Sequence, residues 1–516
     1  MRSISFFLLL FLLFTSPFVQ SQVTSEEVDA LVKESMEKFG VAGVAVAIVK
    51  DGKVIHKKGY GVQSIKTNTP VTERSNFAIA SNTKAFTSAA LAILAEEGKL
   101  KWDDKVVLHL PEFKMYNDYV TQNFNIQDLL THRSGLGLGA GDLMFFPDGA
   151  DFTIQDVLGV FQHFEPVSDF RTRYDYDNVL YLVAGELIAR VSGMSYDDFI
   201  AEKILKPLQM NNSSPSLQEI KDKQSLAMPH TTEYGEIMEI PHIIKSINGA
   251  AGGMFSNVED MSTWMILQLN KGKYGDGQQL FSEENHNEMS KVHTPIEPNR
   301  YPRYNSHFAG YGLGWFLADK KGDLEVSHTG GLPGMLSKVA MLPDRNVGVV
   351  VLTNTENGGS GVFSTITNTV LDSYMGLDDN NWLELNYKNY LNRKSESDEI
   401  TTETWEIVKR ADKNNVKPEN YIGTYRDAWF GDIEVHMKNS QLWISSKRSP
   451  KLNGPLQFYK DNTFAVKWEY QDMNADAFAI FKVDASGKAQ NLKLKGISPN
   501  IDFSFDFQDL DLDRVD

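Results

Sequence analysis

The sequence predicts an α+β domain over residues 22–391 and a smaller antiparallel β domain over residues 416–516. In the first domain, strand-forming segments near both ends enclose a long section with helical patterns, an order typical of one sheet combined with a helical region. In the second, apolar and polar residues alternate with a period of two, which is typical of a small antiparallel barrel or sandwich. Residues 392–415 are charged and polar, so we interpret them as a linker with some helix. A chain of 516 residues is also too long for one compact core.

The first 21 residues have the layout of a secretory signal peptide. Arg2 supplies a positive start, residues 4–14 form an almost unbroken apolar run, and residues 19–21 offer a cleavable position. The run is shorter than the roughly 20 apolar residues that span a bilayer, and no later segment reaches that length. We therefore expect a secreted or periplasmic protein without stable membrane insertion, an uncleaved N-terminal anchor being the alternative.

The elements of the first sheet can be placed by their patterns. Residues 26–39 form an amphipathic helical pattern, and the tight-turn dipeptide Asp51-Gly52 then joins two strand-like runs into a hairpin. Strand patterns return after residue 323, and the last two flank a turn at residues 343–346. The expected strands are residues 41–49, 53–60, 324–328, 337–342 and 347–352.

The second domain shows its strands by alternation. One strand is indicated by the apolar residues Ile433, Val435 and Met437, which alternate with polar neighbours. Two further strands meet across the Ser486-Gly487 turn, where Phe481 and Val483 are expected to face Leu492 and Leu494. The acidic end, residues 506–516, is expected to be a frayed tail.

Composition excludes several classes of function. The formal net charge of −17 opposes phosphate binding, so no nucleic-acid partner is expected. The chain has no cysteine, which excludes disulfides and every thiol-based mechanism. The 11 histidines lack metal-ligand spacing, no Gly-x-Ser-x-Gly elbow occurs, and the glycines of residues 135–140 open no dinucleotide-binding unit. We therefore expect no metal and no other cofactor.

Ser81 and Lys84 are the candidate nucleophile and base. Residues three apart share a face of a helix, so a Lys amine can lie against a Ser hydroxyl. A helix is indicated by Gly98 at its end and by the apolar stripe Phe86, Ala90, Ile93 and Leu94. A Ser hydroxyl is a weak nucleophile until a base takes its proton, which a desolvated Lys with a lowered pKa can do. The same spacing at Ser35 and Lys38 lies in a charged helix and is interpreted as coincidence.

Two further polar clusters lie at the ends of expected elements. Tyr176 and Asn178 precede a strong helical pattern that stops at Gly193, a place from which side chains can reach a substrate. The other cluster ends a strand, and its glycines let a substrate backbone approach closely and leave an N–H free for an oxyanion. This second cluster consists of His328, Thr329, Gly330 and Gly331.

In their order and spacing, the three clusters resemble the motifs of the serine β-lactamase and penicillin-binding protein family. The resemblance is to the branch of class C β-lactamases, D-alanyl-D-alanine carboxypeptidases, D-aminopeptidases and esterases, and it covers about residues 25–373. From residue 421 onward the chain is similar to the lipocalin-like β domain of some of these hydrolases. Further segments match family landmarks and are interpreted as structural, His132 included: residues 129–136, 207–210, 249–254, 311–315 and 352–354.

The resemblance implies a β-lactamase/transpeptidase-like domain followed by an antiparallel β-barrel, and it implies roles for the site residues. Ser81 would attack a carbonyl and become acylated, while Lys84 takes or relays its proton. Tyr176 would pass that proton to the leaving group and later activate the deacylating water. Asn178 would bind the substrate's amide. The N–H groups of Ser81 and Gly331 would form an oxyanion hole, in which each donor contributes roughly 2.7–4 kcal/mol.

One residue departs from the β-lactamase pattern. β-Lactamases carry a Lys where this chain has His328. A Lys is a fixed cation that can hold a substrate carboxylate, whereas a His is often neutral at pH 7. The departure favours the peptidase and esterase relatives.

The expected function is therefore a serine hydrolase that acts through an acyl-enzyme on a small peptide, including D-amino-acid peptides, or on an ester. Two alternatives stay open. One is a β-lactamase or D-alanyl-D-alanine carboxypeptidase acting on penicillins or cell-wall peptides. The other is a catalytically inactive binding or scaffold protein, since a fold does not guarantee activity. Assembly into a homo-oligomer also stays open.

Overall fold

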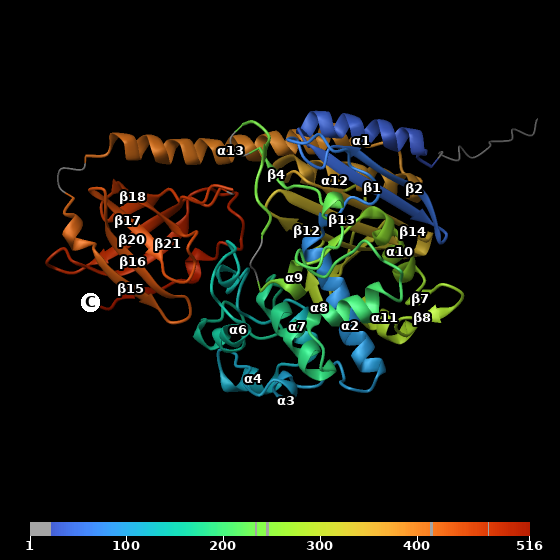
Figure 1. Cartoon of the computed structure of the whole chain (residues 1–516), viewed down its shortest axis with the longest axis horizontal. Coiled ribbons are helices and arrows are strands. Elements are labelled where there is room, and N and C mark those ends of the chain that lie inside the picture. The colour runs from blue at the N-terminus through green and yellow to red at the C-terminus, as the bar shows by residue number, and fades with distance from the viewer. Residues whose placement is uncertain (1–21, 233–234, 244–246, 413–415, 473) are drawn as a thin grey trace, which may run out of the picture.

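The computed structural model describes residues 22–232, 235–243, 247–412, 416–472 and 474–516. The expected signal peptide of residues 1–21 lies outside the described residues, as do residues 413–415 of the expected linker. An eight-stranded antiparallel sheet with helices on its faces is followed by a closed eight-stranded barrel (Figure 1). The prediction of an α+β domain followed by a β-barrel is confirmed. In the described ranges, no helix combines the length and the apolar character that crossing a membrane requires.

The sheet of the first domain brings the two ends of that domain together. Its order is β2-β1-β14-β13-β12-β11-β10-β9, and neighbouring strands are antiparallel. Because β1 lies between β2 and β14, strand patterns appear early and late in the sequence. The strands are β1 (Gly43–Lys50), β2 (Lys53–Gly61), β9 (Thr294–Ile296), β10 (Ala309–Tyr311), β11 (Phe316–Lys320), β12 (Asp323–Leu332), β13 (Met335–Leu342) and β14 (Val347–Thr353).

Helices cover both faces of this sheet (Figure 1). One face packs on α1 (Ser25–Phe39), α12 (Glu356–Met375) and the start of α13 (Trp382–Arg410). The other face packs on the helical region, whose principal helices are α2 (Thr83–Glu96), α7 (Val179–Ser192) and α10 (Val258–Leu269). Side chains alternate along a strand, so β1 sends Val44, Val46 and Ile48 into one core and Ala45, Ala47 and Val49 into the other.

Shorter elements complete the first domain. Its short helices are α3 (Val106–His109), α4 (Asp118–Asn123), α5 (Ile126–Leu130), α6 (Ile154–Val160), α8 (Tyr196–Ile200), α9 (Gly249–Gly252) and α11 (Glu283–Met289). Its small two-stranded sheets pair β3 (Phe77–Ala78) with β6 (Phe255–Ser256), β4 (His230–Thr231) with β5 (Met238–Glu239), and β7 (Lys273–Tyr274) with β8 (Gln278–Gln279).

The local predictions for the first domain agree with these bounds. The β1–β2 hairpin turns at Asp51 and Gly52, whose φ angles of 51° and 72° are left-handed, as a tight hairpin turn requires. Gly98, with φ of 69°, ends the α2 segment as expected. The observed strand β12 is longer than the predicted one at both ends, because its first residues pair with β11 and its last residues with β13.

The barrel runs in sequence order from β15 to β22, which pairs with β15 to close it. Phe481 faces Leu492 as expected, but the antiparallel register of that pair places Leu494 opposite Ala479. Val483 faces Ala489, because the pairing shifts at a bulge after Lys482. The strands are β15 (Gly423–Asp427), β16 (Gly431–Lys438), β17 (Gln441–Ser446), β18 (Asn453–Lys460), β19 (Thr463–Val466), β20 (Ala477–Val483), β21 (Ala489–Gly496) and β22 (Leu512–Arg514).

The prediction that residues 506–516 form a frayed tail is wrong. Strand β22 pairs with both β15 and β21, and without it the barrel would be open. Leu510 and Leu512 are buried in its core, and Asp506 is fully buried against the first domain. The apolar residues between the acidic ones therefore decide the structure of this end.

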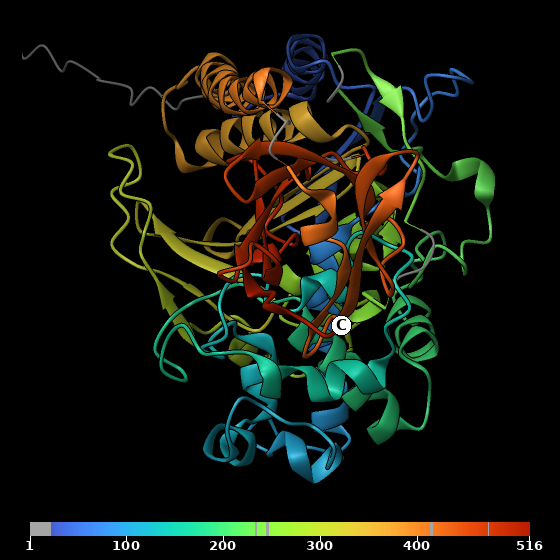
Figure 2. The same cartoon turned by 90° about the vertical axis from the view of Figure 1, so that its left-hand side faces the viewer.

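The barrel lies against the helical region and under α13. The described part of the expected linker is mostly helical, since α13 continues to Arg410 (Figure 1). When the barrel faces the viewer, its red C-terminal segments lie over the helical region (Figure 2). Arg448 of the barrel donates to Asp151 at 2.7 Å and to Asp156 at 3.1 Å, and Phe505 packs on Phe146 with ring centroids 5.0 Å apart. The two domains thus share an interface of charged and aromatic contacts.

Candidate active site

Ser81 lies in a tight turn between a strand and a helix. Strand β3 ends at Ala78, a 3-10 turn covers Ala80–Asn82, and α2 begins at Thr83. Ala80 has a φ of 47°, a conformation that residues with a side chain rarely adopt, and residues held in such conformations cluster at functional sites. The turn is pressed against β12, since a Cβ on Gly330 would lie 2.2 Å from the carbonyl oxygen of Ile79. Only glycine fits at position 330.

Lys84 is fully buried one turn after Ser81. Its Nζ donates to Ser81 Oγ at 3.0 Å, to Asn178 Oδ1 at 2.7 Å and to the carbonyl oxygen of Ala251 at 2.9 Å. Burial lowers the pKa of Lys84 to about 7, although Asp142 and Asp177 favour its charged form. At neutral pH a substantial share of Lys84 is therefore an uncharged amine that can accept a proton from Ser81.

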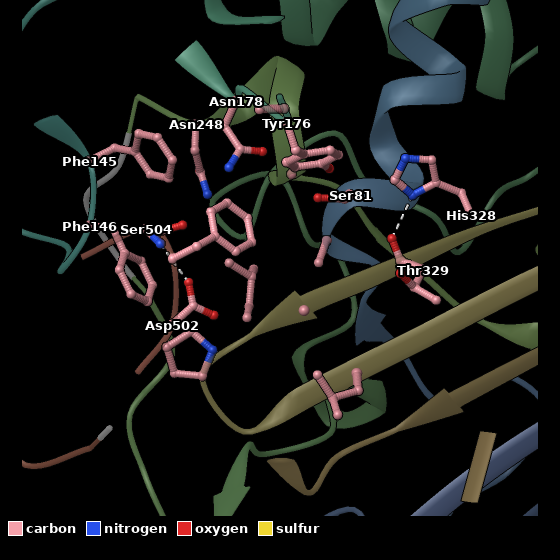
Figure 3. A pocket seen from close by; sticks show the side chains of 18 of the residues that line it. Ser81, Phe145, Phe146, Tyr176, Asn178, Asn248, His328, Thr329, Asp502 and Ser504 are labelled. Carbon is pink, nitrogen blue, oxygen red and sulfur yellow. Dashed lines mark hydrogen bonds between the residues drawn. The ribbon is translucent and has the colours of Figure 1, made fainter. Parts of the chain in front are cut away.

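Tyr176 and Asn178 complete the polar side of the cavity (Figure 3). The Nζ of Lys84 lies 4.8 Å from the centre of the Tyr176 ring. Burial raises the pKa of Tyr176 well above its ordinary value, and a hydrogen bond with Ser81 acts in the opposite direction. Tyr176 is therefore a neutral phenol that can donate a proton. Asn178, at the start of α7, accepts from Lys84 through Oδ1 and donates through Nδ2 to Asp142 Oδ2 at 2.8 Å.

His328 is a neutral side chain with both ring nitrogens engaged. Nδ1 lies 2.6 Å from the carbonyl oxygen of Thr329, so Nδ1 carries the proton, and Nε2 accepts from the Tyr311 hydroxyl at 2.8 Å. Burial, assisted by the nearby charge of Lys84, lowers the pKa of His328 to about 3. It cannot serve as a fixed cation for a substrate carboxylate. Thr329 and Gly331, by contrast, are exposed at the cavity.

A cavity of about 350 Å³ joins the predicted residues. Ser81, Tyr176, Asn178, His328, Thr329 and Gly331 line it, while Lys84 lies beneath it and Gly330 supports it from the strand. Part of its remaining wall is aromatic and includes Phe145, Phe146, Tyr174 and Phe316. The structure thus brings all eight predicted site residues together. The second Ser-x-x-Lys pattern lies elsewhere: Lys38 of α1 pairs with Glu384 of α13.

Sequence reasoning missed the C-terminal domain's share of the site. Asp502 and Ser504 line the cavity (Figure 3), as does Phe503 between them. The ring of Phe503 meets that of Tyr176 edge-on, with centroids 5.7 Å apart. Asp142, fully buried and bonded to Asn178, was also missed. The sequence does contain one sign, because phenylalanine alternates with polar residues from residue 502 to residue 507. Such a pattern is typical of a half-buried segment.

Comparison with known proteins places these features in a family. Residues 28–371 match the family described as Beta-lactamase, and residues 409–514 match a Domain of unknown function (DUF3471). "Protein flp" of Staphylococcus aureus (strain MW2) is 29% identical over 335 residues, which are 64% of this chain and 63% of that protein. "Unguisins hydrolase ungD'" of Aspergillus campestris is 26% identical over 368 residues, 69% of this chain and 67% of that protein. The match to flp therefore spans less than two thirds of its length.

Among solved structures, an octameric penicillin-binding protein homologue from Pyrococcus abyssi has a similar fold. The TM-score is 0.60 at 22% sequence identity, and the superposition covers 95% of this chain and 100% of that one. At this identity the likeness concerns the fold alone.

Proposed function

Since this chain belongs to the β-lactamase family of serine hydrolases, which it matches over residues 28–371, we propose that it hydrolyses a peptide or an ester through an acyl-enzyme on Ser81. The observation that carries this proposal is the buried Lys84 amine, 3.0 Å from Ser81 Oγ at the floor of an aromatic cavity. One relative is named as a hydrolase, Unguisins hydrolase ungD', which supports the reaction class.

In the proposed reaction, Ser81 Oγ attacks the substrate carbonyl as neutral Lys84 accepts its proton. The N–H groups of Ser81 and Gly331 receive the developing oxyanion. Tyr176, a neutral phenol beside both groups, donates a proton to the leaving amine or alkoxide and is reprotonated from Lys84. Water then attacks the acyl-Ser81 carbonyl, its proton passes through the same groups to Ser81 Oγ as the acyl bond breaks, and the acid is released. No cofactor enters these steps.

We expect wild-type protein to gain a single covalent adduct on brief exposure to a fluorophosphonate probe, because such a probe traps a serine activated by a neighbouring base. Intact mass spectrometry measures the adduct, and peptide mapping locates it on the tryptic fragment that contains Ser81. A folded protein that remains unlabelled, or that is labelled at another serine, contradicts the proposal and favours the inactive binding-protein alternative.

The charge of the cavity supports neutral substrates over anionic ones such as penicillins. His328 is uncharged, and Asp502 presents a carboxyl group at the cavity wall. One of its oxygens accepts the N–H of Ser504 at 2.9 Å. Burial raises the pKa of Asp502, while its hydrogen bonds with Ser504 act in the opposite direction. An anionic substrate therefore meets no fixed cation at this wall, and the ionised form of Asp502 repels it. Peptidase or esterase activity is accordingly proposed ahead of β-lactamase or carboxypeptidase activity.

We expect kcat/KM for p-nitrophenyl valerate to exceed that for p-nitrophenyl hemisuccinate, which ends in a carboxylate, by about tenfold. Asp502→Asn should bring the two values closer together, since it removes the opposing charge at nearly constant volume. Asp513→Asn, on the far strand β22, is the matched control and should leave the ratio unchanged. A preference for the carboxylate ester in the wild type would reverse the proposed specificity.

Export and assembly are also proposals. Export is supported by the composition of residues 1–21, and self-association is suggested by an octameric protein with a similar fold.

A further inference from the structure

A short segment of the C-terminal domain is seated in the first domain beside the cavity. Asp506 is fully buried and accepts the N–H groups of Gly141 at 2.8 Å and Leu143 at 2.9 Å. Gly139 lies equally close, because a Cβ there would be 2.7 Å from the carbonyl oxygen of Phe503. The loop of residues 139–143 is thus held by residues 503–506, more than 350 positions later in the chain.

This loop carries Asp142, which connects the C-terminal domain to the candidate base. Ser504 Oγ and Asn178 Nδ2 both donate to Asp142 Oδ2, each at 2.8 Å. Asn178 Oδ1 in turn accepts from Lys84 Nζ at 2.7 Å. A continuous series of hydrogen bonds therefore runs from Ser504 through Asp142 and Asn178 to Lys84 and Ser81.

We propose that Ser504 and Asp506 of the C-terminal domain are positioning residues of the active site, which act through Asp142 to hold the Asn178 amide against Lys84. The inference rests on the proposed function, because it assigns these residues to the same acyl transfer. Neither residue need touch the reacting atoms. Asp506 fixes the loop, and Ser504 fixes the carboxyl oxygen that orients Asn178.

Adhesion between the domains does not explain this arrangement. The charge of Asp502 disfavours ionisation of Asp142, and the charge of Asp142 disfavours ionisation of Asp506. Burying carboxylates costs free energy that apolar contacts would not cost. The interface has such contacts nearby, in Phe146 and Phe505. It also has a polar contact between two side chains that do not line the cavity, Ser397 of α13 and Ser498, at 2.7 Å. Elsewhere at the interface, carboxylates pair with Arg448 and Lys451, whereas Asp142 and Ser504 form the connection to the Asn178–Lys84 pair.

The same network predicts how the charge on Lys84 responds. Lys84 faces Asp142 and Asp177, and Asp502 and Asp506 act on Asp142 from the C-terminal side. The hydrogen bond from Ser504 favours the ionised form of Asp142, which favours the charged form of Lys84. Losing that bond raises the pKa of Asp142 and therefore lowers that of Lys84. The neighbouring groups that stay neutral are His132, His328, Tyr176 and Tyr181.

The test compares Ser504→Ala with wild type by the pH profiles of kcat and KM for a p-nitrophenyl ester. We expect kcat to fall about tenfold, as for loss of a hydrogen bond to a charged group, with KM within about twofold. The acid limb of the profile should move to lower pH. Ser504→Thr, which keeps the hydroxyl, should restore most of kcat. Ser498→Ala, the matched interface variant, should have the kcat and the acid limb of the wild type.

Two results would overturn the inference. One is a Ser504→Ala enzyme with an unchanged kcat and profile. The other is an acid limb that moves to higher pH in Ser504→Ala and Ser498→Ala alike, because general loosening of the interface hydrates Lys84 and returns its pKa toward the ordinary value. Should Ser504→Ala fail to fold, Ser504→Cys gives the comparison at similar volume, because a thiol is a much weaker hydrogen-bond donor than a hydroxyl. Failure of the proposed function is distinct, since the wild type itself would then neither react with the fluorophosphonate nor hydrolyse the ester.

Discussion

Changing Ser81 to alanine will lower kcat/KM for p-nitrophenyl esters by about 10⁴-fold or more, because no acyl-enzyme can form without its hydroxyl. What remains should be the modest stabilisation of a transition state by the cavity and its N–H groups. Ser81 bonds to Lys84 and Tyr176 only through this hydroxyl, and Lys84 keeps its contacts with Asn178 and Ala251 in the variant. Thermal unfolding should therefore change by no more than about 4 °C.

Ser35→Ala is the matched control for this experiment. Ser35 also stands three residues before a lysine and is also buried, but it lies in α1, and Lys38 is paired with Glu384. Its replacement should leave ester hydrolysis and fluorophosphonate labelling intact. If Ser81→Ala kept more than about 1% of wild-type kcat/KM, the nucleophile would have to be another group.

The sequence predicted the parts of this site that local structure determines. The spacing of Ser81 and Lys84 brings them together because both belong to one short helical segment. The identity of His328 predicted a weaker carboxylate site, and its two hydrogen bonds and lowered pKa give the physical reason. The strands of the sheet followed from alternation and turn residues. The roles of Ser81, Lys84 and His328 in the reaction stay predictions until the variants are measured.

What the sequence did not predict depends on contacts between distant segments. Asp142 lies in a glycine-rich loop without a motif of its own, and its partner Ser504 follows it by 362 positions. The acidic composition of residues 506–516 led to an expectation of a frayed end, because the last residues of a domain are often poorly ordered. In the structure, Phe505 packs on Phe146 across the interface and Asp506 lies in the interior, whereas Asp511 and Asp513 stay exposed. The shift of pairing after Lys482 was equally invisible, since a bulge changes which residues face each other.

Lys84→Met will abolish ester hydrolysis about as completely as Ser81→Ala, again by about 10⁴-fold, because the variant fills the same space but offers no proton acceptor. The dependence of wild-type kcat/KM on pH should show that Lys84 is this proton acceptor. Lys84 has a pKa lowered to about 7, so its neutral form predominates above that pH, and kcat/KM should fall as the pH drops through this value. Burial also raises the pKa of Asp142 to about 7, so the observed midpoint belongs to the coupled pair. A pH profile of kcat/KM measures it, and circular dichroism checks that the variant folds.

The double variant Ser81→Ala/Lys84→Met tests whether the two side chains act as one catalytic unit. If the two side chains act as one nucleophilic unit, removing both costs no more than removing either, because the second change deletes a group that already has no reaction to assist. If Lys84 only maintained structure, the two losses would instead multiply. An additive double variant, or a Lys84→Met enzyme whose activity returned at high pH, would assign the base to another group, and Tyr176 would be the residue to change next. A non-additive result would identify the 3.0 Å contact between Lys84 Nζ and Ser81 Oγ as the interaction on which hydrolysis depends.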